Sequence, residues 1–424
     1  MANRNSIAQR LQFAYQSEGG KKLAKTRTLQ PYATLLLKDV VKNFLGGENG
    51  KGPLQIEVLT DETEPPSVIS RTYGEMDLGN FGSGLPADVE HATGEFTMPG
   101  LLHDSSYRSS IFVMAAPGKD VSAHFQLYRG LDGGVSGLET RKIPAGTLGQ
   151  WSVGKLFPGK MREGESMTVR VILSQPGITF ASIVDNISGD SAVFLGKRTA
   201  TSWVIPVVAH IPGKENTLWS STATLWNANS SVSEISLEYL PEKTDNSSGG
   251  IWGSPFLLGA YDTFPLDDVL SERFGVTNGK GALVIKASKP ITVTSRVWTA
   301  GPAGGTAGNG VRTVHSSELA DGDVVLPGVS MLNGFRTNVG VVTGNAPATL
   351  EFTLRDYDGS SLATEFLDVP PRTLTQLSIN KIFGNQVTKP DPVGSLVVSS
   401  VTEFLAYLTV IDGTSQDPVF VTSP

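Results

Sequence analysis

The sequence contains no cysteine among its 424 residues, so disulfide bonds, thiol catalysis and cysteine-based metal sites are excluded. No run of about 18 apolar residues is present, and a membrane span is therefore not expected. The first 25 residues lack the apolar segment of a secretory signal peptide. The five histidines stand singly, outside the spacing of a zinc site, and no G-x-S-x-G nucleophile motif occurs. We therefore expect no enzymatic activity and no cofactor.

Charged residues are few, at 18%, and they are unevenly placed. The chain has a formal net charge of −7, but residues 1–27 carry a net of +5, which leaves −12 for the remainder. A basic segment can bind nucleic acid, yet no nucleic-acid-binding motif accompanies this one. We expect a solvated strand and loop here, and no nucleic-acid partner.

Glycine and proline are abundant, at 47 and 25 residues, and valine, serine and threonine are common. β-Branched residues favour strands, and glycine and proline favour the turns between them. The composition therefore indicates many short strands joined by turns.

The tetrapeptide NGKG occurs at residues 49–52 and again at residues 278–281, 229 residues later. Further segments match in the same order at offsets near 226. They are SVISRTY with TVTSRVW, MPGLLHDSSYRSS with LPGVSMLNGFRTN, IPAGTLGQWSVGKLFPG with VPPRTLTQLSINKIFG, and ASIVDNISGDSAVF with LTVIDGTSQDPVF. Ordered matches at nearly one offset indicate a tandem duplication.

Each half divides again into two units, because a short helical turn ending in glycine recurs four times along the chain. We predict an all-β chain of tandem Ig-like antiparallel β-sandwich domains, each with one short helical turn. The predicted domains are an incomplete sandwich at 1–76, complete sandwiches at 95–198, 199–300 and 322–424, and Gly-rich linkers at 77–94 and 301–321.

A glycine-rich turn with a lysine could bind phosphate, but a P-loop needs G-x-x-x-x-G-K-[ST] between a strand and a long helix. Neither NGKG copy has that context, whereas Asn-Gly is a strong turn signal. We predict a turn before an alternating strand in both copies.

The first unit lacks a counterpart of residues 203–227, which contain the segments WVIPVVAH and LWSSTATLWN. Ala2 aligns with Ala228, and Leu11 and Phe13 align with Leu237 and Tyr239. A sandwich without two strands exposes a core face and an unpaired edge. We therefore predict that self-association or a second polypeptide completes the first domain, or else that the unit borrows a strand internally or docks on the second unit.

Four repeated carboxylates bracket the bends VDNISGD and IDGTSQD, namely Asp185, Asp190, Asp412 and Asp417. Asx turns, in which the carboxylate accepts from nearby backbone N–H groups, explain them without a metal. Calcium is the alternative, because it binds carboxylate and carbonyl oxygens.

Five of the six tryptophans lie in the third unit. Exposed aromatic rings on a sandwich can stack on sugars, which makes Trp219, Trp226 and Trp252 candidate glycan-binding residues. The alternative is packing, since large aromatic side chains usually bury apolar area.

Three motifs recur across the units: an aromatic–[RS]–[ST] opening strand in GFRTNVGVV and LWSSTATLW, a Q-x-x-x-x-K-hydrophobic-F turn, and a D-[NG]-x-S-x-D closing bend. Together they resemble tandem-repeat β-sandwich proteins secreted by bacteria, whose function is uncharacterised. The resemblance covers nearly the whole chain. It implies the sandwich fold and a secreted or cell-surface location, and it transfers no catalytic residue.

Three functions fit these observations: a structural or adhesive subunit of a cell-surface assembly or filament, a carbohydrate-binding protein that uses the third domain, and an accessory region of a larger exported enzyme. We favour the first, because the repeats carry no polar constellation typical of catalysis.

Overall fold

The computed structural model describes residues 1–48, 50–76, 79–87, 91–213, 217–301, 304–331, 334–384, 389–390 and 393–422. Asn49 of the first NGKG copy and parts of both predicted linkers lie outside these residues. Every strand pairing in the described chain is antiparallel, and helices are few and short. The predicted all-β class is thus confirmed. Within the described chain, no helix has the length and apolarity needed to cross a membrane.

The strands group into four successive units. The first unit has β1 (Gln9–Gln16), β2 (Lys22–Leu29), β3 (Leu54–Val58), β4 (Ile69–Met76) and β5 (Gly79–Pro86). The second has β6 (Ala92–Leu101), β7 (Tyr107–Ala115), β8 (Val121–Arg129), β9 (Val135–Ile143), β10 (Leu148–Ser152), β11 (Met167–Asp185) and β12 (Ser191–Leu195).

The third unit has β13 (Ala200–Pro212), β14 (Leu218–Asn227), β15 (Ser233–Pro241), β16 (Ile251–Trp252), β17 (Phe256–Leu258), β18 (Thr263–Leu266), β19 (Gly279–Ala300), β20 (Thr306–Val311) and β21 (Val314–His315). The fourth has β22 (Ala320–Val329), β23 (Arg336–Thr343), β24 (Ala348–Arg355), β25 (Ser361–Val369), β26 (Leu374–Ser378), β27 (Gly394–Ile411) and β28 (Pro418–Thr422).

Each complete unit is a sandwich whose two sheets share one long strand. The first half of β11 pairs with β6 and β8, and its second half pairs with β7 and β12. In the third unit, β19 is divided in the same way: its first half pairs with β13 and β15, and its second half pairs with β14 and β20. In the fourth unit, the first half of β27 pairs with β22 and β24, and its second half pairs with β23 and β28. Strand β8 shows why these segments fold as strands: Val121, Ala123, Phe125 and Leu127 are buried at every second position.

The first unit has two separate strands, β3 and β4, in place of the long one. β1 lies between β2 and β3 in one sheet, and β4 pairs with β5 in the other. Among its described residues, the main hydrophobic cluster is correspondingly small and contains the buried side chains of Leu11, Phe13, Leu29, Ala33 and Phe44.

The predicted helical turns are present in all four units. They are a π-helical turn η1 (Val40–Phe44) and the α-helices α1 (Val153–Leu156), α2 (Val269–Phe274) and α3 (Ile379–Phe383). The 3-10 turn η2 (Ser316–Glu318) lies outside this repeat. Gly275 ends α2 in the left-handed conformation, at φ 65°, as the repeated terminal glycine predicts.

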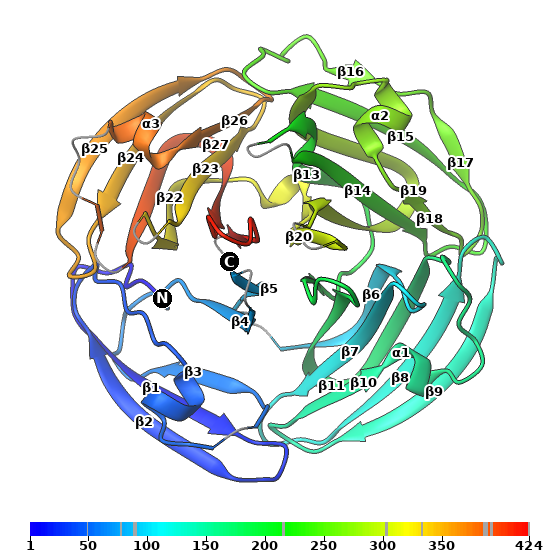
Figure 1. Cartoon of the computed structure of the whole chain (residues 1–424), viewed down its shortest axis with the longest axis horizontal. Helices are drawn as coiled ribbons and strands as arrows, with labels where there is room; N and C mark the ends of the chain where they lie inside the picture. Colours follow the sequence, from blue (N-terminus) through cyan, green and yellow to red (C-terminus); the bar gives the residue numbers. More distant parts are fainter. Residues whose placement is uncertain are drawn as a thin grey trace.

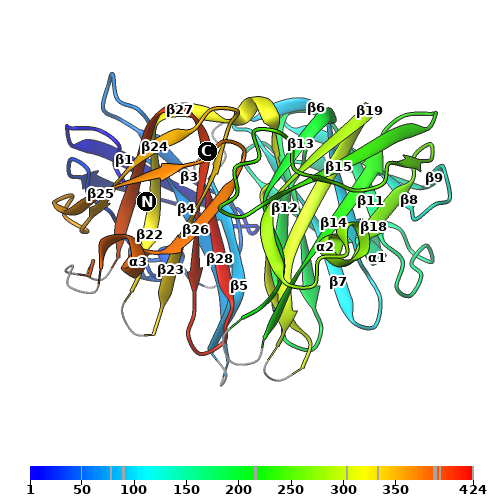
Figure 2. The same cartoon turned by 90° about the horizontal axis from the view of Figure 1, so that it is seen from above.

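The four units form a closed ring, with the first unit lying between the fourth and the second (Figure 1). β5, β12, β20 and β28, here called the central strands, come from the four units and contact one another at the centre of the ring. In the perpendicular view β5, β12 and β28 run through the thickness of the ring (Figure 2).

Contacts between neighbouring units follow the tandem duplication. Tyr128 of the second unit packs on Trp226 and Tyr261 of the third, with ring centroids 5.0 and 5.7 Å apart. Where the fourth unit meets the first, Arg355 lies over the ring of Tyr32 at 4.4 Å. The Thr34 N–H donates to the Tyr357 carbonyl there at 2.8 Å. These contacts between the fourth and first units close the ring.

The glycine-rich stretches predicted as linkers contain strands. β5 lies within residues 77–94 and pairs with β4, and β20 lies within residues 301–321 and pairs with β19. Their glycines are needed for close approach. A Cβ built at Gly82 would lie 2.1 Å from the Thr72 carbonyl oxygen, and one at Gly308 would lie 2.3 Å from that of Val297.

The turn predicted for NGKG is wrong for most of the second copy, because β19 begins at Gly279, whereas Lys51 and Gly52 of the first copy precede β3. Lys51 pairs with Glu18 at 3.4 Å, and Lys280 pairs with Glu242 at 3.3 Å, so both lysines form an ion pair within their own unit. Gly52 and Gly281 lie against the neighbouring strand, where an added Cβ would be 2.0 Å from a carbonyl oxygen.

The alignment of the first unit differs by two residues from the predicted one. The Asn3 side chain donates to the carbonyls of Ile7, Leu29 and Gln30. Asn227 makes the equivalent three bonds in the third unit, to Ser231, Leu258 and Gly259. Asn3 therefore corresponds to Asn227, and Leu11 to Ile235. The sequence match was displaced because Asn229 offers a second asparagine nearby.

The close approach at Gly281 predicts that Gly281→Ala lowers the unfolding free energy by about 1–3 kcal/mol through overpacking. Gly134→Ala is the control, because no described residue has an atom within 4 Å of an added Cβ there. It should change stability by about 0.5 kcal/mol or less. Thermal unfolding, with hydrogen exchange of β15 and β19, measures both variants. Equal midpoints for the two would contradict the steric explanation.

Candidate functional site

The repeated acidic bends form Asx turns at the ends of the long strands. The Asp185 carboxylate accepts from the backbone N–H groups of Ile187 and Ser188 at 2.8 and 3.0 Å. In the other half, Asp412 accepts from Thr414 and Ser415 at 2.8 and 3.2 Å. Both aspartates thus have the turn role that the bend motif predicts.

The second carboxylate oxygen of Asp185 reaches the next unit. It accepts from the Thr306 backbone N–H at 2.9 Å and from the Thr306 hydroxyl at 3.0 Å. Burial acts to raise the pKa of Asp185, but the hydrogen bonds from Ser188, Ile187 and Thr306 outweigh it and hold the pKa below its ordinary value. The carboxylate is therefore ionised, and it ties the bend of the second unit to the start of β20.

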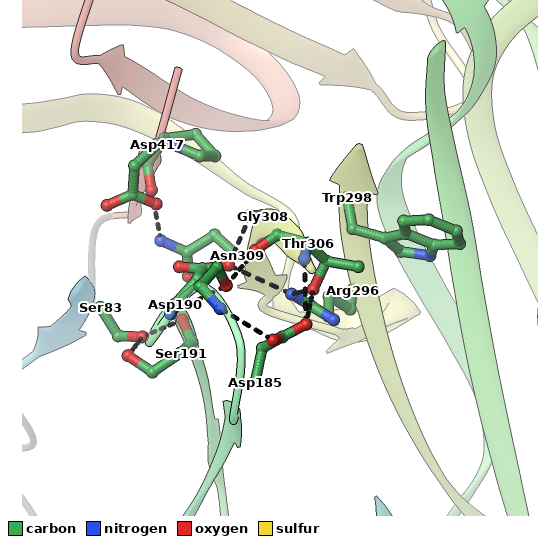
Figure 3. A network of polar contacts seen from close by, with 12 residues as sticks. Ser83, Asp185, Asp190, Ser191, Arg296, Trp298, Thr306, Gly308, Asn309 and Asp417 are labelled. Atoms are coloured by element: carbon green, nitrogen blue, oxygen red, sulfur yellow. Dashed lines mark hydrogen bonds and ion pairs between the residues drawn. The ribbon is translucent and has the colours of Figure 1, made fainter. Parts of the chain in front are cut away.

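Asp190 and Asp417 make equivalent contacts across two unit boundaries. Asp190 Oδ2 accepts from the Gly308 N–H at 2.7 Å and from Arg296 at 3.1 Å, both in the third unit (Figure 3). Asp417 Oδ2 accepts from the Gly82 N–H at 2.9 Å and from Arg71 at 2.8 Å, both in the first unit.

The other two boundaries are joined through a side chain that follows each of these glycines. The Ser83 hydroxyl donates to the Ser191 carbonyl, which links the first and second units. The Asn309 side chain donates to the Pro418 carbonyl at 2.8 Å, which links the third and fourth units. Together with the two aspartates, these contacts form a closed circuit of hydrogen bonds around the axis, here called the axial network.

The two axial carboxyls are buried and influence each other. Both side chains are 0% exposed, and one oxygen of each, Oδ1, has no hydrogen-bond partner. Burial raises the pKa of Asp190 to about 6, against the attraction of Arg296. Burial, and then the nearby charge of Asp190, raise the pKa of Asp417 to about 8, against the attraction of Arg71.

The aspartates are predictable from the sequence, but their partners lie outside the bend motif that identifies them. Arg71 and Arg296 occupy the same place in the repeated segments SVISRTY and TVTSRVW. Gly82 and Gly308 lie in the stretches predicted as linkers. The repeated arginine was the signal that could have been used, because a charged residue repeated within an apolar strand needs a buried partner.

The four aspartates predicted as possible calcium ligands do not form a metal site in the described residues. No group of three or more histidine, aspartate or glutamate side chains is placed to hold a metal there. Each of the four candidate aspartates already accepts hydrogen bonds with at least one oxygen.

The three candidate glycan-binding tryptophans have different surroundings. Trp226 is fully buried against Tyr128, so its ring is closed to a sugar. Trp219 is half-buried and pairs with Ile211 on β13. Trp252 is 53% exposed, and Lys286 lies over its ring at 5.6 Å. The strand register does not bring Trp219 and Trp252 together.

One histidine contacts a carboxylate, at the start of α2. His210 Nδ1 and the Ser220 hydroxyl both bond Asp268, at 2.5 and 3.2 Å. Asp268 also caps α2 by accepting from the Ser271 N–H. In a catalytic triad the serine hydroxyl is hydrogen-bonded to the histidine. Here the Ser220 hydroxyl is hydrogen-bonded to Asp268 instead.

A small cavity of about 40 Å³ lies between the central strands. All four of them line it, through residues that include Gly84, Phe194, Gly310 and Phe420. A space of this size holds about one water molecule.

The chain matches no known protein family and no curated protein. Among solved structures it is similar to a tetra-tandem repeat in the extending region of a large adhesion protein, at 12% identity over 99% of this chain and 92% of the other. The TM-score is 0.13. At that value the similarity supports no conclusion about this chain's fold or function.

The axial network predicts that Asp417→Ala separates the first unit from the fourth. The change leaves the buried Gly82 N–H and the Arg71 guanidinium without their acceptor, which costs about 1–3 kcal/mol or more. Hydrogen exchange of β4 and β28 should accelerate, and small-angle scattering should show a larger radius of gyration. Asp132→Ala is the control, because Asp132 is 38% exposed and pairs with Arg129 at the surface. Similar effects for both variants would contradict the assigned role.

The raised pKa values of Asp190 and Asp417 predict a pH dependence with a defined sign. Between the ordinary aspartate value of 3.8 and about 8, the folded ring binds more protons than the unfolded chain. The contribution of this pair to stability is therefore complete below pH 3.8 and is lost as the pH rises through about 6 to 8. Each unit of raised pKa corresponds to about 1.4 kcal/mol.

Denaturant unfolding at pH 5 and pH 8 tests this dependence against the double variant Asp190→Asn/Asp417→Asn. The loss of stability towards pH 8 should be smaller in the variant than in the parent chain. An equal loss in both would assign the dependence to other groups.

Proposed function

We propose that the chain is a non-enzymatic structural or adhesive subunit of an extracellular assembly. In this proposal the closed ring holds the outward-facing sheets of its units in fixed positions, and the first unit provides the contact with a neighbouring protein. The extracellular location rests on the resemblance of the repeat motifs to secreted tandem-sandwich proteins.

One observation carries this proposal. The polar residues repeated between the two halves are used to join units to one another. Asp190 and Asp417 bond the next unit's glycine and arginine, and Asp185 bonds Thr306. Repeated residues with a shared role in assembly favour a scaffold over a catalyst, because a catalytic group must remain available to a substrate.

Carbohydrate binding is the second candidate, and Trp252 is the observation that favours it. Its ring is 53% exposed on β16, at the outside of the third unit. A single exposed tryptophan with a lysine over its face is a smaller platform than the three candidate tryptophans of the sequence would provide. Service as an accessory region of an exported enzyme remains the third alternative.

Display of the chain on the surface of a non-adherent host bacterium tests the proposal. Cells carrying the parent chain should remain on a coated surface under flow, or aggregate, more than cells carrying an unrelated sandwich domain. The ring-opening variant Asp190→Ala/Asp417→Ala should lose most of this gain, because the sheets no longer keep fixed positions. Trp252→Ala should keep it.

The opposite pattern, with loss in Trp252→Ala and none in the ring-opening variant, would favour glycan binding. No gain for the parent chain would overturn the adhesive role.

A further inference from the structure

The first unit has unpaired strand edges where the third unit has neighbours. In the third unit, the second half of β19 lies between β14 and β20. In the first unit, β4 pairs with β5 alone among the described strands. Within the described part of the chain, β3 likewise pairs only with β1, whereas the first half of β19 lies between β13 and β15.

The structural equivalence of the two units locates this edge closely. Ala2 forms isolated bridges to Ser67 and Thr34. Trp226, the last buried residue of β14 before Asn227, pairs in the same way with Thr292 and Thr263. Ala2 therefore occupies the place of Trp226. The edge of β4 beyond Ser67 corresponds to the edge of β19 that the rest of β14 covers.

Exposure of matched residues supports this correspondence. Ser295 on β19 is 2% exposed and lies beside its paired strand β14, whereas its counterpart Ser70 on β4 is exposed. The core residues Leu283 and Ile285 are fully buried. Their counterparts Leu54 and Ile56 are only half-buried, so apolar area of the first unit remains open beside the unpaired edges.

The neighbouring unit also leaves space for a strand at this edge. An added Cβ at Gly100 of the second unit would lie 2.9 Å from the Thr224 hydroxyl oxygen of β14. Its counterpart in the fourth unit is Gly328, in the matched segment LPG. No atom of the described residues lies within 4 Å of an added Cβ at Gly328. The contact that β14 makes with the preceding unit thus has no equivalent between the fourth and first units.

We propose that the edge of β4 binds an extended segment of another polypeptide, which adds a strand to the first unit in the place that β14 has in the third. This extends the proposed structural function by naming how the ring binds its neighbour. Backbone hydrogen bonds to β4 would supply affinity, and side chains facing the half-buried core would supply specificity.

β14 indicates the chemistry of the partner segment. Its sequence, LWSSTATLWN, has no charged residue. Ala223 and Leu225 are fully buried, and Thr224 contacts the neighbouring unit at Gly100. The partner segment should therefore be an uncharged strand of about eight residues that alternates small or hydroxyl-bearing side chains with apolar ones. A second copy of this chain is a poor donor, because all the described strands are already paired.

A synthetic peptide of residues 218–227 is the probe, because β14 fits the equivalent edge. Since the chain has no cysteine, register can be read by disulfide formation without background. Ser295 lies opposite Ala223 in the β14–β19 pairing. The variant Ser70→Cys should therefore form a disulfide with an Ala223→Cys peptide in a glutathione redox buffer.

Two matched controls define the specificity. The same peptide with Ser220→Cys in place of Ala223→Cys should react much less, because its cysteine lies three residues away, about 10 Å along the strand. The protein variant Thr26→Cys carries an exposed cysteine on β2, at the other side of the first unit, and should not react. Circular dichroism verifies that both protein variants are folded.

Hydrogen exchange of the unmodified chain gives an independent measurement. Excess peptide should slow exchange of the β4 amides by about tenfold or more. A peptide with proline at the Thr222 and Thr224 positions should not, because it lacks the backbone N–H groups.

Three results would overturn the proposal. They are disulfide formation that does not depend on the cysteine position, an unprotected β4 in the presence of peptide, and a dimer that already protects β4 without peptide. These readouts are separate from surface retention, so either proposal can fail while the other stands.

Discussion

The ring depends on a buried carboxylate that accepts hydrogen bonds from the next unit. Asp190 and Asp417 each bind a glycine N–H and an arginine across a unit boundary. A buried polar group is costly when it has no hydrogen-bond partner, so these contacts specify one arrangement of neighbours. Glycine is required at the donor position because the paired strand of the same unit, β4 for Gly82 and β19 for Gly308, leaves no room for a Cβ. Aspartate, arginine and glycine thus form one structural unit, although they are far apart in sequence.

The tandem duplication explains why the ring closes. The boundary between the second and third units and the boundary between the fourth and first have the same axial contacts. The remaining two boundaries share a second type, through Ser83 and Asn309. Two types of contact in alternation need an even number of units to close, and four units satisfy this. A linear array would leave one aspartate and one arginine at its ends without these partners.

Much of the fold could be predicted from the sequence, and the reasons are local. Strands such as β8 are predictable because apolar residues alternate along them, and those residues are the buried ones. The helical turns are predictable because each ends near a glycine, such as Gly275. The acidic bends were recognisable as Asx turns because their partners lie two and three residues away. The axial network was not predictable in this way, since Asp417 and Arg71 are separated by 346 residues. The strands β5 and β20 are rich in glycine, and a glycine-rich sequence is also typical of a linker. Here glycine permits close packing against a neighbouring strand, and no nearby sequence pattern indicates that packing.

The long shared strands determine how force passes through the ring. β19 runs for 22 residues through both sheets of the third unit, so a load on the outer sheet reaches the axis along one continuous backbone. β11 and β27 do the same in their units. In the first unit that path is interrupted between β3 and β4, and a load must cross the irregular segment 59–68. Under tension the first unit would therefore extend at a lower force than the other three units.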